Sequence, residues 1–151
     1  MCMIEDAEFC TIWNVTNPKA RKSHTCTECG RTIEAAEQYM RIESLYDGFW
    51  STQRVCSHCK VGADWLTKEC HGFLAGGILE DIRQHAEEYR SFGLWRIIAG
   101  SDLKWKYKSG RTMPVPAMPR LSAPHTDDRV IGSMPSQTTP AIETENPTKE
   151  E

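Results

Sequence analysis

Two Cys-x-x-Cys pairs, separated by 26 residues, constrain the fold of this chain more than any other feature of its sequence. The first pair is Cys26 and Cys29, and the second is Cys56 and Cys59. Two residues between paired thiolates allow a tight turn to direct both sulfur atoms at one ion, and Gly30 accepts the backbone conformation that such a turn requires. Four thiolates form a closed tetrahedral site of the structural zinc kind. Iron is the alternative, because it accepts the same ligands.

The segment between the two pairs has the pattern of a β-hairpin. Residues 38–46 and 49–55 flank Asp47-Gly48, a dipeptide that supplies the positive φ angles of a type I′ turn. This turn places Leu45 opposite Trp50 and brings the second cysteine pair back to the first. We expect the buried face of the hairpin to comprise Met40, Ile42, Tyr46, Phe49 and Val55. We expect the solvated face to carry Arg41, Glu43, Arg54 and Trp50.

The rest of the folded region predicts one further strand and three helices. The strand is expected over residues 7–15. After Cys56 the apolar spacing becomes helical, and the first helix holds the second cysteine pair and ends at Gly72. The third helix is expected from Phe92 to Trp105. The predicted fold class is α+β: a treble-clef-like zinc module of knuckle, hairpin and helix, followed by two further helices.

The second helix is predicted to begin at Gly76-Gly77. Its apolar residues at helical spacing are Ile78, Leu79, Ile82, Ala86 and Tyr89. We expect Glu87-Glu88 and His85 to lie together on the side of this helix that faces water.

The composition changes sharply near Ser109. Seven of the eight prolines lie in residues 109–151, and this stretch contains no Trp, Tyr or Phe. Such a segment cannot bury enough apolar surface to offset the entropy cost of ordering. We therefore predict a zinc-binding α+β domain over 1–108 and a Pro/Ser/Thr-rich, mostly disordered tail over 109–151, in which Met113–Pro116 can dock on the body as a short extended segment.

Charge and cysteine usage restrict the class of protein. The net charge of -3 excludes a bulk phosphate binder, although basic segments at 19–22 and 104–108 leave a local nucleic-acid contact open. The apolar stretches are too short to span a bilayer, and acidic residues occupy the N-terminal region where a signal peptide would be basic. An odd number of cysteines, four of them in two pairs, indicates metal binding in the reducing cytoplasm. We expect no membrane partner and no small-molecule substrate.

The stretch from Ala20 to Trp65 resembles small uncharacterised zinc-binding proteins of phages and prophages. The resemblance is carried by RKSHTCTECGRTI, by the Tyr-Asp-Gly-Phe-Trp turn and by VCSHCKVGADWL, and it extends through the helices to Met113–Pro116. It implies a phage-encoded protein in the cytoplasm of a bacterial host, with a zinc site and no established activity.

Catalytic uses of such a zinc module lack their residues in this sequence. An HNH-type nuclease requires a histidine base and further His or Asn ligands on the hairpin and helix. Between Cys29 and Cys56 there is neither His nor Asn, and His71 lies at the far end of the following helix. The zinc-deaminase signature is missing too, because no proline precedes either cysteine pair. We therefore predict that the protein is not an enzyme.

Further His and Cys residues are weaker candidates for metal chemistry. His24 and His58 flank the metal ligands, where either could replace a cysteine or donate a hydrogen bond to a sulfur atom. We expect them to lie around the ligands or to face solvent. Cys70-His71 together with Cys2 or Cys10 is a candidate for a second metal site. Adjacent ligands are geometrically awkward, so we favour buried thiols at these positions.

Two functions fit these features. The first is a non-enzymatic interaction module, in which structural zinc fixes the fold and exposed aromatic residues bind a host or phage protein. Trp50 and Phe49 beside the turn are its candidate contacts. The alternative is a nucleic-acid-binding regulator, whose candidate contacts are Lys104, Trp105 and Lys106, where cations alternate with an aromatic ring.

Overall fold

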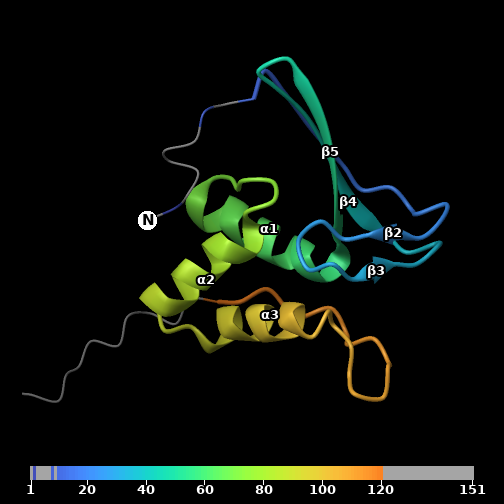
Figure 1. Cartoon of the computed structure of the whole chain (residues 1–151). Coiled ribbons are helices and arrows are strands. Elements are labelled where there is room, and N and C mark those ends of the chain that lie inside the picture. Colours follow the sequence, from blue (N-terminus) through green and yellow to red (C-terminus); the bar gives the residue numbers. More distant parts are fainter. Residues whose placement is uncertain (1, 3–7, 9, 121–151) are drawn as a thin grey trace, which may run out of the picture.

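The chain forms an α+β fold in which three helices pack at the base of a long antiparallel hairpin (Figure 1). The structure is a computed structural model that describes residues 2, 8 and 10–120. Two antiparallel sheets occur within these residues, so the predicted α+β class is confirmed. No helix in this part of the chain is long and apolar enough to cross a membrane.

Strands β4 (Tyr39–Tyr46) and β5 (Phe49–Cys56) form the predicted hairpin. Asp47 and Gly48 have φ angles of 48° and 77°, and positive values at both positions are what a type I′ turn requires. The register is the predicted one, with Leu45 opposite Trp50. The two-residue turn therefore sets the pairing of the whole hairpin.

Strand β1 (Ile12–Thr16) pairs with β4, so the larger sheet has the order β1-β4-β5. The structure thus places this strand later in the sequence than the predicted residues 7–15. Residues 7 and 9 of the predicted strand lie outside the described residues. All five residues of β1 are exposed, because this strand forms an edge of the sheet beyond the helices (Figure 1).

Only the base of the hairpin is covered by helices. Met40, Ile42 and Val55 are buried there, as predicted. Tyr46 and Phe49 belong to the same face nearer the turn, and they are 46% and 76% exposed. The prediction that these two aromatic residues are buried is wrong, because the outer half of the hairpin extends past the helices (Figure 1).

A short two-stranded sheet precedes the hairpin. Strands β2 (His24–Thr25) and β3 (Thr32–Ile33) pair antiparallel and enclose the first Cys-x-x-Cys pair. Gly30 has a φ of 71° within this turn, and its amide donates to the Cys26 carbonyl over 3.0 Å. The knuckle therefore uses the conformational freedom of Gly30 as the sequence predicts.

Helices α1 (Ser57–Cys70), α2 (Ile78–Glu88) and α3 (Phe92–Asp102) supply most of the core. Helix α1 ends at Cys70 and is capped by His71, which adopts a left-handed φ of 62° one residue before the expected Gly72. Helix α3 ends at Asp102, before the expected Trp105. The largest fully buried apolar side chains of the three helices are Trp65, Leu66, Ile78, Ile82, Leu94 and Ile97.

The chain beyond α3 returns across the helices, and we call residues 105–119 the strap. The amide of Met113 donates to the Trp105 carbonyl over 2.7 Å, and His58 Nε2 donates to the Met113 carbonyl over 2.7 Å. Pro119 is buried against Gly93. Contact with the body therefore continues past the predicted domain boundary at Lys108, and the predicted tail beyond residue 120 lies outside the described residues.

Removing the strap should destabilise the fold, whereas removing the residues after it should not. Truncation after Lys108 removes the half-buried Met113 side chain and the hydrogen bond from His58 to the Met113 carbonyl, at a cost of about 2–4 kcal/mol. Truncation after Arg120 is the matched control and should leave the midpoint of urea unfolding unchanged. Equal midpoints for both truncated chains would show that the strap contributes no stability.

Candidate metal centre

The four paired cysteines come together where the knuckle meets the base of the hairpin. Cys26 follows β2, Cys29 lies in the knuckle turn, Cys56 ends β5, and Cys59 lies in the first turn of α1. Their Sγ atoms all lie within 4.8 Å of one another. The hairpin thus brings two sequence-distant pairs to one point, as their spacing predicts.

The distances match a tetrahedral metal site. The Sγ atoms of Cys29 and Cys56 are 3.8 Å apart. Sulfur ligands at about 2.3 Å from a central zinc ion would be separated by about 3.8 Å. Cys26, Cys56 and Cys59 are buried and Cys29 is half-buried. The four residues could therefore hold a metal ion in a largely closed site.

The sulfur atoms of the cluster change one another's ionisation. A hydrogen bond from the Cys29 thiol lowers the pKa of Cys26 to about 7, and one from Cys26 lowers that of Cys56 well below its ordinary value. Interaction with Cys26 raises the pKa of Cys29 and of Cys59. Four thiols at these distances cannot all ionise beside one another unless a positive ion compensates their charge.

Two groups of the protein already favour negative charge at these sulfur atoms. The amide of Cys56 donates to Cys26 Sγ over 3.3 Å at the positive end of α1, which has no acidic residue in its first turn. The Arg31 guanidinium is buried and pairs with the Glu37 carboxylate. Burial opposes the charge of Arg31, but Glu37 and the Cys56 thiolate raise its pKa above the ordinary value. Arg31 therefore links the sulfur cluster to the turn before β4.

Glu28 joins the knuckle to the start of α2. Its Oε1 accepts from the Gly76 amide over 2.8 Å, and its Oε2 accepts from the Leu79 amide over 3.4 Å. Burial raises the pKa of Glu28, while these backbone donors lower it. The Glu28 carboxylate thus accepts hydrogen bonds from amides at the start of α2 that have no acceptor within that helix. A residue that lies between two candidate metal ligands therefore caps a helix.

Sequence reasoning missed the roles of Arg31, Glu37 and Glu28. For two of these residues the sequence indicates a role only by their place in the chain. Glu28 lies between the two cysteines of the first pair, and Arg31 follows Gly30. The partners of these side chains are distant in sequence or depend on the path of the chain after the knuckle. Their contacts therefore require the folded structure.

The histidines beside the ligands have different surroundings. His58 is buried, donates to the strap and lies 4.8 Å from the ring of Trp105 between centroids. His24 lies 5.6 Å from the ring of Tyr39. Neither histidine is a member of the sulfur cluster within the described residues.

The candidate partner-binding residues divide into exposed and buried ones. Phe49 and Trp50 are 76% and 65% exposed, and Lys104 and Lys106 are also exposed. Trp105 is only 3% exposed, because it packs on the face of α3 at Gly100, where no Cβ could fit. The prediction that Trp105 contributes an exposed stacking ring is therefore wrong.

The remaining cysteines are arranged differently from the sequence prediction. Cys2 and Cys70 form a disulfide in place of two buried thiols, and Cys10 is free. His85, and not His71, lies beside this pair. The expectation that His85 faces water is wrong, since it is 1% exposed. Its helical spacing from Ile78 and Ile82, seven and three residues earlier, is the sequence signal for this burial.

Loss of one metal ligand should unfold the base of the hairpin. Cys56→Ser should abolish metal binding at the four-cysteine site and cooperative unfolding, because a structural zinc ion contributes on the order of 10 kcal/mol to small modules. Native mass spectrometry and thermal unfolding followed by circular dichroism measure the two effects. Cys10→Ser is the matched control, since Cys10 is free and outside the cluster. A metal-free Cys56→Ser chain that still unfolds cooperatively at the wild-type temperature would contradict this prediction.

Glu28→Ala should lower the free energy of unfolding by about 1 kcal/mol, as expected for the loss of a helix cap. The exposed Glu34→Ala is the control. Chemical denaturation measures both, and the cap has no energetic role if the two variants unfold at the same midpoint.

Comparisons with known proteins give no assignment. No protein-family model matches the chain, and neither a curated protein nor a solved structure matches it. Its function must therefore be inferred from the geometry of its own residues.

Proposed function

We propose that this chain is a non-enzymatic protein-interaction module, encoded by a phage, in which a treble-clef-like structural zinc site holds a projecting hairpin for contact with a host or phage protein. Zinc is the preferred ion because four thiolates in a closed tetrahedral arrangement are the ligand set of structural zinc sites. The knuckle of β2 and β3, the β4–β5 hairpin and α1 occur in the treble-clef order.

The closed ligand set supports a structural role for the metal. All four positions of a tetrahedral ion are taken by cysteines, three of which are buried. A catalytic zinc site instead keeps one position for water or substrate. The ion therefore acts by fixing the knuckle, the hairpin base and α1 relative to one another.

The hairpin tip carries the interaction proposal. Tyr46, Phe49 and Trp50 are 46%, 76% and 65% exposed. Ile12, Leu45 and Trp50 are aligned across the three strands by their register and so lie on the same face of the sheet. Large apolar side chains gathered on an exposed element are typical of protein-binding surfaces, where aromatic residues supply most of the binding energy. Tyr46 and Phe49 lie on the opposite face of the hairpin, so these five residues cover both faces of its outer end, and we call them the tip surface.

A nucleic-acid interface is the second candidate, and a cluster of cations around the knuckle favours it. Burial, together with the charges of Arg54 and Lys22, lowers the pKa of His24. The Lys104 side chain lies 3.9 Å from the position that a Cβ on Gly30 would occupy. Arg54 and Lys22 beside His24, and Lys104 beside Gly30, thus bring positive charge to the knuckle. With Trp105 buried, this surface lacks the stacking ring that the alternating pattern predicts, so we rank it second.

Site-specific photocrosslinking in infected host cells tests the tip surface. A photoreactive phenylalanine analogue replaces Phe49 in one variant and Phe92 in the control, since both side chains are about equally exposed and Phe92 begins α3 at the opposite end of the molecule (Figure 1). We expect one specific crosslinked protein from position 49 and none from position 92. Equal crosslinking from both positions would contradict the assignment of the surface.

With the crosslinked protein purified, Trp50→Ala should weaken its binding by roughly 2 kcal/mol or more while leaving the unfolding temperature unchanged. Trp95→Ala, on the exposed part of α3, is the control. Titration calorimetry measures the affinities. Equal affinity of the Trp50 variant and wild type would remove the tip surface from the proposal.

A salt titration with DNA and RNA distinguishes the second candidate. Under the interaction proposal, binding is weak and the change of Lys104, Lys106 and Lys108 to alanine has little effect. Tight binding whose salt dependence falls by up to about three units of slope in the triple variant would favour the nucleic-acid function instead.

A further inference from the structure

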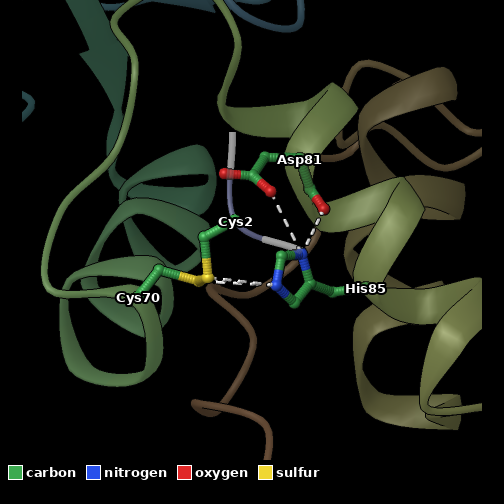
Figure 2. The surroundings of a disulfide bond; sticks show 4 residues. All are labelled: Cys2, Cys70, Asp81 and His85. Atoms are coloured by element: carbon green, nitrogen blue, oxygen red, sulfur yellow. Dashed lines mark hydrogen bonds and ion pairs between the residues drawn. A yellow bond between two sulfur atoms is a disulfide. The ribbon is translucent and has the colours of Figure 1, made fainter. Parts of the chain in front are cut away.

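A second cluster of metal-ligating side chains lies at the opposite end of α1 from the sulfur cluster. Cys70 ends α1, His85 lies in α2, and Cys2 comes from the N-terminal segment. Figure 2 shows the two sulfur atoms facing the edge of the His85 ring. His85 Nε2 lies 3.4 Å from Cys70 Sγ and 3.6 Å from Cys2 Sγ. One potential ligand atom from each residue thus lies within 4.8 Å of the other two, with the two sulfur atoms joined in the disulfide.

The opposite nitrogen of the same ring is held by Asp81. His85 Nδ1 donates to the Asp81 backbone carbonyl over 2.8 Å and lies 3.1 Å from Asp81 Oδ1 (Figure 2). Both residues are 1% exposed. Because Nδ1 faces two oxygen acceptors, it carries the ring hydrogen in the neutral imidazole. The lone pair is then on Nε2 and faces the sulfur atoms, which is the tautomer that a metal ligand requires.

This arrangement is the one that surrounds metal-binding histidines. A ligating histidine commonly donates its other N–H to a carboxylate or a backbone carbonyl, which fixes the ring and increases its basicity. Here Asp81 supplies both acceptors from one turn earlier in α2. Two thiolates and one imidazole are, in addition, a recognised zinc ligand set that leaves a fourth position for water.

We propose that Cys2, Cys70 and His85 bind a second zinc ion when the Cys2–Cys70 pair is reduced, with Asp81 as the residue that positions His85. The disulfide is the metal-free form of the same site, because its two sulfur atoms are bonded to each other and are not thiolates. A dithiol reductant transfers two electrons and two protons to the Cys2–Cys70 bond and is itself oxidised to a disulfide. Zinc then displaces one proton from each of the two thiols. This inference is independent of the proposed function.

Cys2 is suited to the entry of reductant and metal. It is half-buried, whereas Cys70 and His85 are buried between α1 and α2. Zinc in this position would join Cys2 to the last residue of α1 and the last turn of α2, at a place remote from the four-cysteine centre in the chain.

Counting metal ions on the full-length protein under a phosphine reductant tests the proposal. Native mass spectrometry after zinc loading should give two zinc ions for the wild type and one for Cys2→Ser. Cys10→Ser is the matched control and should keep two, since Cys10 lies outside both clusters. Cys2 is the position changed because its partial exposure allows the variant to fold. A single zinc ion in the wild type, with alkylation proving that Cys2 and Cys70 are reduced, would overturn the proposal, as would two in Cys2→Ser.

Asp81→Asn tests the positioning role separately. Titration against a chromophoric chelator should show one zinc ion bound 10–100-fold more weakly and the other with unchanged affinity. Unchanged affinity of both ions in a folded Asp81→Asn chain would overturn the role of Asp81.

Discussion

The convergence of four cysteine sulfur atoms within 4.8 Å of one another is the constraint on which the rest of this structure depends. Three of these sulfur atoms are buried, and their neighbours already include the Arg31 guanidinium and the start of α1. These groups lower the cost of negative charge without neutralising it. The four cysteines could hold a metal ion, which would fix the knuckle, the base of the hairpin and α1 at one point. Glu28 links the start of α2 to this point, and the core around Trp65 joins the helices to one another.

Local rules account for the parts of the fold that could be predicted from the sequence. The Asp47-Gly48 turn determines its own backbone angles and therefore the register of sixteen paired residues. The spacing of the cysteines requires the hairpin to return to its origin, so the sulfur cluster follows from the same rule. Helix ends depend on one or two residues and were displaced by only a few positions, as the left-handed His71 shows.

Tertiary features account for the parts that could not be predicted. Alternation along a strand identifies which side chains share a face, but it does not show how far the helices cover that face. Tyr46 and Phe49 lie beyond the covered part and are exposed. Trp105 is buried because Gly100 leaves room for its ring, and this depends on where the strap begins. His85 was assigned to water from its charged neighbours, although its helical spacing from Ile82 places it on the apolar face.

The partial coverage of the hairpin has a consequence for its dynamics. Helix α1 continues directly from β5 at Cys56, whereas the described contacts of the strands near Asp47 are their mutual hydrogen bonds, the pairing with β1, and hydrogen bonds to Thr11 and Glu8. The free energy of local opening should therefore decrease along the hairpin from Cys56 to the turn. A side chain such as Trp50 is thus attached to a compliant end with an anchored base, and it can adjust to the shape of a partner without any cost to the stability of the core.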